Sequence, residues 1–501
     1  FGSSDNFGSP PFGRQQVQIG SACRLLGMSS TAANNGIKFQ PPPRPASLRR
    51  SVLSLHAGLA AAVLFFVVMG ELMKRHVPEG KFEKKDGTLI DINDFDPVEL
   101  GPYPKCHPHN GEYEQVDESG SRTWVKIKDA PTAGPFPPGH PENPEFLAKR
   151  DVEVKREVKE EMFTWKGLQP SLHLLALATL CVCLGSKHGV WLFTEPERPG
   201  EGAAEAQTML KKEDAYWFPI MGSALLFTLF IIYKYVGSDW IKFLVSCYIL
   251  FMCMLTFGVN LGHFVDVVRG EVTKPLFKVP YFDVSVTIYD IVGSIVGACL
   301  SWAYIVTKNW IINNVFGLSF CLMGLKKIAT SNFKTGGIML LGLFFYDIFW
   351  VFGSKSVFGS NVMVTVAKGV EAPIKLMFPR SVNGCGKLEF SMLGLGDIVV
   401  PGIYIAFMAK WDAAVQSQPC PYLTGCMVAY ALSLITTVAV MLLFNAAQPA
   451  LLYIVPYVLV ASVAVALVRG ELRELWAYEI PDKEEEAEKA KEDKAKEEKD
   501  K

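Results

Sequence analysis

Two aspartates lie inside long apolar stretches of this chain, and they are the residues best suited to chemistry. Asp347 lies in the run 340–353, and Asp397 lies in the run 392–402. A carboxylate inside a bilayer costs roughly 2.5–3.5 kcal/mol even on insertion scales, so acids at such positions are expected to be functional. Two carboxylates that share one proton can divide the work of hydrolysis, because the ionised one deprotonates water and the protonated one polarises the scissile carbonyl. The pair therefore predicts an aspartic protease mechanism, which needs no metal and no other cofactor.

The rest of the chain must hold these acids at one depth in a membrane. Half of its 501 residues are hydrophobic, and the charged residues crowd into the first third and the last thirty residues. From about residue 169 to residue 468 the chain is a series of apolar runs near 20 residues long, which predicts an all-α polytopic membrane protein with about nine transmembrane helices. The predicted spans are 169–193, 217–236, 240–262, 284–307, 310–329, 335–353, 390–410, 423–445 and 449–468. The two acids then lie in neighbouring spans.

Small residues and a tyrosine flank the two acids. Gly394 and Gly396 remove side chains beside Asp397, which favours close backbone approach and local flexibility. Tyr346 precedes Asp347 and is placed to hydrogen-bond in the site. The substrate must reach the acids in an extended form, because the carbonyl groups of an intact helix are already hydrogen-bonded.

The last predicted span begins at a proline. Pro449 is expected to occupy its first helical turn, a position that proline suits. Ala450, which follows, is small enough to permit tight packing against a neighbouring helix.

Other functions for intramembrane acids stay open at this point. A carboxylate-based transporter or channel would use the same residue type, although no internal repeat of the kind found in transporters is evident. A non-catalytic membrane chaperone is a third alternative. Asp290 repeats the Tyr-Asp dipeptide but lies near the start of its span, where a helix-end acid is ordinary. Asp239, Asp266 and Asp412 lie at span ends and are interpreted as caps or interface residues.

The regions outside the predicted spans divide into four parts. Residues 1–50 form a disordered N-terminal tail, within which Met28 is a candidate start. Residues 51–70 form either a signal anchor, which would be an extra N-terminal span, or a cleaved signal sequence. Residues 71–168 are a polar, Pro-rich extension whose Cys106 and nearby histidines lack the second ligand cluster of a metal site. Residues 469–501 form a charged tail. Most of the lysines and arginines between the spans lie on the same side of the membrane as this tail, which predicts that the tail is cytosolic. No nucleic-acid partner is predicted.

Three short motifs together resemble those of the GxGD intramembrane aspartyl proteases. They are Tyr346-Asp347, Gly394-Leu395-Gly396-Asp397 and Gln448-Pro449-Ala450-Leu451, each in an apolar segment and in this order. The runs 349–353, 361–368, 371–376 and 448–456 resemble the signal peptide peptidase branch more than its more distant homologues. The resemblance covers about residues 169–480. Residues 1–165 have no recognised counterpart in the family.

The resemblance implies a function and a location. It implies an endopeptidase that cleaves signal peptides and type II-oriented transmembrane segments in the endoplasmic reticulum membrane. Asp347 and Asp397 would be its catalytic pair, and residues 449–451 would support the site and contact substrates or inhibitors. The sequence ends in Glu498-Lys-Asp-Lys501 rather than the di-lysine retrieval signal that members often carry. The transmembrane peptide and the lipid bilayer are the expected partners, and self-association stays open.

Overall fold

The structure is a computed structural model that describes most of the chain. The described residues are 46–72, 81–83, 88–94, 112–116, 122–126, 165–194, 208–232, 239–270, 273–279, 284–358, 362, 366, 373–382, 388–415, 417, 420–444 and 448–480. The expectations for residues 1–45, for Cys106 and its neighbours, and for the final twenty-one residues lie outside them. Of the apolar run 361–368, the structure describes Val362 and Val366, which are both buried.

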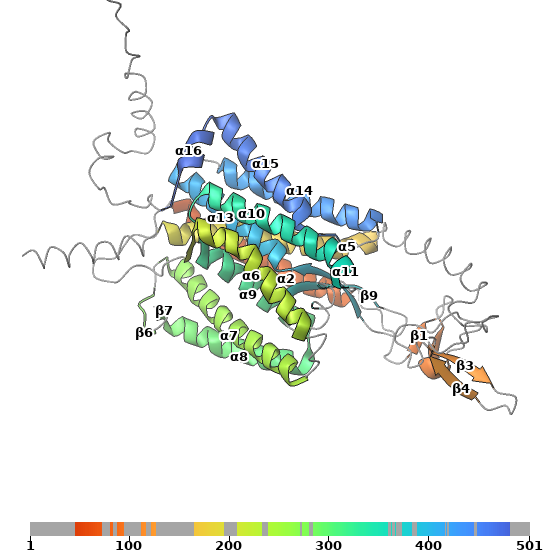
Figure 1. Ribbon diagram of the computed structural model, residues 1–501. Coiled ribbons are helices and arrows are strands. Elements are labelled where there is room, and N and C mark those ends of the chain that lie inside the picture. Colours follow the sequence, from red (N-terminus) through yellow and green to blue (C-terminus); the bar gives the residue numbers. More distant parts are fainter. Residues whose placement is uncertain are drawn as a thin grey trace, which may run out of the picture.

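Long helices make up most of the described chain (Figure 1). They are α2 (Ala46–Leu72), α5 (Trp165–Phe193), α6 (Lys212–Ile231), α7 (Asp239–Arg269), α8 (Ile288–Thr307), α9 (Trp310–Lys327), α10 (Phe333–Ile348), α13 (Gly396–Ala414), α14 (Pro421–Phe444) and α15 (Leu451–Arg469). The π-helix η5 (Phe349–Gly353) and the short α11 (Ser354–Phe358) continue α10, and α16 (Leu472–Ala477) follows α15. Eight described helices are long and apolar enough to cross a membrane. The prediction of an all-α polytopic membrane protein is therefore confirmed.

Five two-stranded sheets accompany the described helices. Antiparallel pairs are formed by β1 (Lys81–Glu83) with β2 (Leu89–Asp91), by β3 (Glu112–Val116) with β4 (Arg122–Lys126), and by β6 (Phe277–Val279) with β7 (Val284–Val286). The parallel pair is β5 (Thr208–Leu210) with β8 (Ile328–Thr330). The fifth sheet, β9 (Lys375–Val382) with β10 (Leu388–Gly394), is antiparallel and leads directly into α13.

The β9–β10 hairpin corrects the prediction of a span over 390–410. Residues 388–394 form a strand, and the helix begins only at Gly396. The sequence carries the reason, because Leu388, Phe390 and Met392 alternate with polar residues at the period of a strand. The register of the pair shifts between Glu389 and Phe390, opposite Pro379, which has no N–H to donate to a ladder.

Helix α13 lies at the centre of the bundle. It packs against α5, α14, α9 and α10, and nearly every residue from Ile398 to Asp412 is buried. Gly185 of α5 and Gly402 of α13 both face Leu325 of α9, where a Cβ at either glycine would overlap the leucine side chain. These two glycines therefore allow α5, α9 and α13 to approach one another closely.

Helix α2, which begins at Ala46, is part of the described bundle, whereas the protease domain was expected to begin at residue 169. Helix α2 packs on α5 and α7, and its Val52 side chain lies in the main hydrophobic core. The Nε atom of Arg49 donates to the carbonyl oxygen of Val267 at 3.1 Å, and Nζ of Lys187 lies 2.6 Å from Oγ of Ser51. The apolar segment expected as an anchor or signal is thus an integral helix of the described bundle.

The bundle also extends past the boundary expected at residue 469. Leu475 of α16 and Ile480 are buried. The N–H of Ile480 donates to the carbonyl oxygen of Ser331 at 2.8 Å, and Asn332 forms a β-bridge with Glu479. Residues 470–480 therefore fold back on the start of α10 rather than forming part of a solvated tail.

One end of the bundle gathers the start of α6, the start of α10 and the end of α15. The β5–β8 pair joins the segment before α6 to the segment before α10. The bridge between Asn332 and Glu479 joins the start of α10 to the segment after α15. We call this the α16 end, and it carries the exposed basic residues Lys212, Lys334 and Arg473.

Candidate active site

Asp347 lies in the last turn of α10 and is 5% exposed. The start of this helix is fixed by Asn332, whose side chain accepts a hydrogen bond from the backbone N–H of Thr335 at 2.8 Å. The carboxylate oxygen Oδ2 of Asp347 accepts a hydrogen bond from the backbone N–H of Leu451 at 3.1 Å. Helices α10 and α15 pack against each other, so the first acid is held by the third motif.

Asp397 is the second residue of α13, immediately after the β10 strand. The N–H of Leu395, the N-cap residue, donates to the carbonyl oxygen of Ile374 at 3.3 Å, which continues the hairpin ladder to the helix start. The hydroxyl of Tyr430 on α14 donates to the carbonyl oxygen of Asp397 at 3.1 Å. The second acid is therefore fixed through its backbone, and its carboxylate accepts no hydrogen bond from the residues that the structure describes.

The two acids meet where α10 and α13 pack together. Asp347 is in the last turn of α10 and Asp397 in the first turn of α13, and these two helices pack against each other. Two carboxylates close together in a low dielectric cannot both ionise at low cost, so they share one proton and titrate as a pair. A pair of this kind can supply one general base and one general acid.

The third motif lies at the start of α15, with one difference from expectation. Ala450 is the N-cap and α15 begins at Leu451, so Pro449 precedes the helix instead of occupying its first turn. The carbonyl of Pro449 still accepts from the N–H of Leu452 at 3.3 Å. Pro449 and Ala450 are buried, and the side-chain oxygen of Gln448 accepts from the hydroxyl of Tyr453 at 3.5 Å. The motif presents the Leu451 N–H to Asp347.

The other predicted site residues have distinct environments. A Cβ on Gly394 would touch Oδ2 of Asp397 at 3.4 Å, whereas a Cβ on Gly396 would meet no atom within 4 Å. The absence of a side chain at Gly394 therefore leaves one face of the carboxylate open. No hydrogen bond joins Tyr346 to Asp347 among the described residues, and the tyrosine ring packs towards Trp350, with ring centroids 6.3 Å apart. The hydrogen bond expected of Tyr346 is not made here.

The carboxylates that sequence analysis set aside have structural roles. Asp290 forms a capping box with Thr287 at the start of α8, which confirms its interpretation as a helix-end acid. Asp412 accepts from the backbone N–H groups of Tyr422 and Leu423 at 3.3 and 2.7 Å, and so caps α14. Among the described residues, no group of three or more potential ligands is placed to hold a metal ion.

Two asparagines of α9 belong to the site region and were missed by sequence reasoning. Asn314 donates to the carbonyl of Met377 at 2.6 Å and accepts from the N–H of the same residue at 2.8 Å. Asn313 donates to the carbonyl of Lys375 at 2.7 Å. These amides occupy the outer edge of β9 as a neighbouring strand would. The sequence signal that could have identified them is the pair of adjacent asparagines inside the apolar run 310–329.

The π-helix η5 was also missed, and it begins two residues after Asp347. Such bulges arise mostly as single turns in α-helices and are frequent at functional sites. Trp350 in this turn is buried, and its indole N–H donates to the hydroxyl of Ser223 on α6 at 3.1 Å. The turn therefore ties α10 to α6 just beyond the first acid.

Comparisons with known proteins find one matching family model and several relatives. The family model described as signal peptide peptidase matches residues 202–482, which include all three motifs. Signal peptide peptidase of Homo sapiens is 36% identical over 299 residues, covering 56% of this chain and 76% of that protein. Intramembrane protease 2 of Caenorhabditis elegans is 40% identical over 233 residues, covering 44% of this chain and 47% of that protein. A solved presenilin family intramembrane aspartate protease covers 59% of this chain and 99% of its own length at 15% identity, with a TM-score of 0.37, too low to carry an argument.

Proposed function

Because this chain belongs to the signal peptide peptidase family and is an intramembrane aspartic endopeptidase, we propose that Asp347 and Asp397 are its catalytic pair. The observation that carries the proposal is the convergence of three distant motifs on one point. The Leu451 N–H is bonded to Asp347, and α10, which carries Asp347, packs on α13, whose second residue is Asp397. The membership also sets aside the transporter, channel and chaperone alternatives.

The proposed reaction uses the shared proton of the pair. The ionised carboxylate takes a proton from a water molecule, whose oxygen attacks the scissile carbonyl carbon. The protonated carboxyl donates its hydrogen bond to the carbonyl oxygen as charge develops there. A proton then passes to the departing nitrogen, the C–N bond breaks, and the pair returns to its singly protonated state. The Leu451 N–H holds Asp347 in place throughout the reaction. This donor belongs to the backbone of α15, so no side-chain rotation can move it away.

The β9–β10 hairpin offers a receptor for an unwound substrate. Asn313 and Asn314 cover the outer edge of β9, so the other edge of the two-stranded sheet belongs to β10. This strand ends at Gly394, three residues before Asp397. An extended peptide can add to a sheet edge through main-chain hydrogen bonds. Pairing with β10 would replace the helical hydrogen bonds that a transmembrane substrate loses when it unwinds.

We extend the proposal to substrate class, orientation and compartment. Relatives of this chain are named signal peptide peptidases, which supports signal peptides and type II-oriented transmembrane segments as substrates. The basic residues of the α16 end support a cytosolic position for that end and for the C-terminus. We propose the endoplasmic reticulum membrane as the compartment that goes with these substrates. Protease accessibility of a C-terminal epitope in intact microsomes tests the orientation.

The test of the catalytic pair uses the purified full chain and a model signal peptide. Asp347→Ala and Asp397→Ala should each abolish cleavage, and the double variant should lose no more than either single one, because residues acting as a unit are non-additive. Asp347→Asn and Asp397→Asn keep the side-chain shape and guard against a folding defect. Asp290→Ala is the matched control and should stay active, since Asp290 caps α8. Cleavage by either purified single variant would refute the assignment.

A further inference from the structure

A proline interrupts the hydrogen bonding of α13 beside the second acid. Pro401 is buried inside this helix, four residues after Asp397. In a regular α-helix the carbonyl of each residue accepts from the N–H four residues later, so the donor for Asp397 would belong to residue 401. Proline has no N–H, and its ring crowds the carbonyl four residues before it. Pro401 therefore deprives the Asp397 carbonyl of its regular helical donor.

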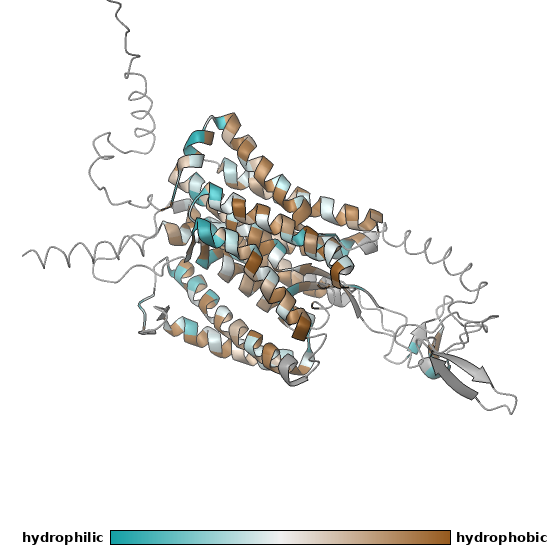
Figure 2. Cartoon of the chain, in the orientation of Figure 1, coloured by the Kyte–Doolittle hydropathy of each residue, from teal (hydrophilic) through white to brown (hydrophobic). Residues whose placement is uncertain are grey.

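The hydroxyl of Tyr430 supplies a donor from the neighbouring helix α14. It donates to the carbonyl oxygen of Asp397 at 3.1 Å, and the Tyr430 side chain is fully buried in the main hydrophobic core. The helices of the bundle are mostly hydrophobic along their length (Figure 2). Because such surroundings offer no replacement donor, the loss of this hydroxyl would leave the carbonyl without a partner for its missing helical bond.

The position of the Tyr430 hydroxyl is itself fixed by contacts between α13 and α14. The two helices pack against each other. At the far end of α13, the carboxylate of Asp412 accepts from the backbone N–H groups of Tyr422 and Leu423 at 3.3 and 2.7 Å. Helix α14 is thus attached to α13 at its own start and again at Tyr430, so the hydroxyl gives the Asp397 carbonyl a stationary partner.

We propose that Tyr430 is a positioning residue for the proteolytic reaction, acting through the Asp397 carbonyl that Pro401 leaves without a helical donor. The inference rests on the catalytic role proposed for Asp397. Asp397 is only the second residue of α13, so a turn of its peptide group also moves its carboxylate. A displacement of about 1 Å at a reacting group can cost roughly 100-fold in rate. The role assigned to Tyr430 requires no contact with substrate and no proton transfer.

The first test is Tyr430→Phe in the purified full chain, with cleavage of a model signal peptide as the assay. Phenylalanine keeps the packing of the ring and removes only the hydroxyl. We expect kcat to fall by at least about fivefold, the factor that matches the lower end of the cost of an unpartnered buried carbonyl. KM should stay the same, because a misplaced Asp397 weakens interactions that form only in the transition state.

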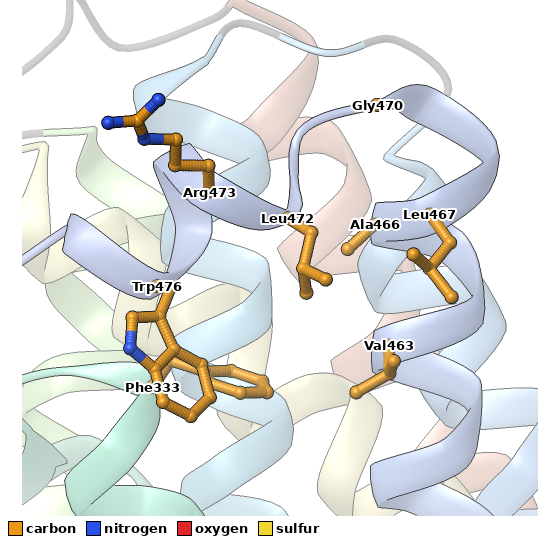
Figure 3. A pocket seen from close by; sticks show the side chains of 8 residues that line it. All are labelled: Phe333, Val463, Ala466, Leu467, Gly470, Leu472, Arg473 and Trp476. Carbon is orange, nitrogen blue, oxygen red and sulfur yellow. The ribbon is translucent and has the colours of Figure 1, made fainter.

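Tyr404→Phe is the matched control. Tyr404 also lies on α13 and is fully buried, and its hydroxyl is 2.8 Å from Oγ of Ser462 on α15. Its ring centroid is 6.0 Å from that of Phe333, which lines the groove at the α16 end (Figure 3). Phe333 begins α10, whereas Asp347 lies in the last turn of that helix. Tyr404→Phe should therefore lower the melting temperature about as much as Tyr430→Phe and leave kcat unchanged.

Pro401→Ala gives a rescue that a merely structural tyrosine would not show. With this substitution residue 401 regains an N–H, which can donate to the Asp397 carbonyl along the helix. The effect of Tyr430→Phe is then measured within each background, so that any effect of Pro401→Ala by itself cancels. We expect Tyr430→Phe to lower kcat by less than about twofold when combined with Pro401→Ala, because the carbonyl no longer depends on the hydroxyl.

Two outcomes would overturn the inference. One is a Tyr430→Phe variant that melts earlier but keeps its kcat, and the other is an equal loss of kcat with and without Pro401→Ala. Asp397→Asn in the same assay separates this inference from the proposed function. An active Asp397→Asn variant would refute the catalytic role of Asp397, whereas an inactive one beside a fully active Tyr430→Phe variant would refute only the role of Tyr430.

Discussion

The asparagine contacts to β9 allow a quantitative test of how the hairpin serves the active site. In Asn314→Leu the branched side-chain shape is kept in a larger side chain, but both hydrogen bonds to Met377, at 2.6 and 2.8 Å, are lost. Each buried backbone group left without a partner costs about 1–3 kcal/mol. Because Met377 is only partly buried, the lower value applies to both groups. Docking of the hairpin on α9 should therefore weaken by about 2 kcal/mol.

This energy predicts a specific loss of activity. A change of about 2 kcal/mol corresponds to roughly 30-fold in an equilibrium constant, so kcat/KM for a model signal peptide should fall by up to that factor. The reason is that β10 leads directly into Asp397, and a hairpin that leaves α9 moves both the strand and the start of α13. The assay is cleavage by the purified full chain, with the melting temperature measured in the same detergent.

Asn309→Ala is the matched control for this experiment. Asn309 caps α9, and its side chain accepts from the N–H of Ile311 at 2.8 Å without touching the hairpin. Its removal should cost about 1 kcal/mol of helix stability and leave kcat/KM unchanged. If Asn314→Leu lowers the melting temperature but not kcat/KM, or if both variants lose activity alike, the hairpin does not position the site in the way described.

Three further predictions concern stability, substrate and the N-terminal helix. Asp412→Ala should lower the free energy of unfolding by about 1–2 kcal/mol, because two N–H groups at the start of α14 lose their acceptor; Asp412→Asn, which keeps an acceptor, should lose less in thermal melts, and equal losses would contradict the capping role. A central Gly or Pro in a leucine-rich substrate helix should raise its cleavage rate, since the scissile carbonyl must leave its helical hydrogen bond; equal rates across such a series, with binding measured separately, would show that helix opening does not limit the reaction. A chain that starts near Glu161 should keep the catalytic residues but melt at a lower temperature than the full chain, because it lacks α2, which contributes Val52 and Leu59 to the core. A chain that starts at Ala46 keeps α2 and should melt at the same temperature as the full chain. Equal melting temperatures of the two shortened chains would mean that α2 adds no stability.

The sequence alone was sufficient for the membrane class and the chemistry. Apolar runs of membrane length predict helices because the bilayer satisfies no backbone polar groups. A buried acid is costly in lipid, so Asp347 and Asp397 stood out without any structure. Asp290 was separated from them by its position near a helix start, and the capping box agrees with that reading. These inferences depend on local composition and spacing, which a single segment contains.

The tertiary structure decided what depends on contacts between distant segments. Residues 388–394 have the alternation of a strand, but they needed β9 as a partner, and their apolar content resembled part of a span. The donor of Leu451 faces Asp347 only because α15 packs on α10, 104 residues away in sequence. The inclusion of α2 and of residues 470–480 in the bundle likewise rests on long-range contacts. The local sequence determines whether a segment prefers helix or strand. Which other segments it packs against depends on the free energy of contacts with residues that the segment does not contain.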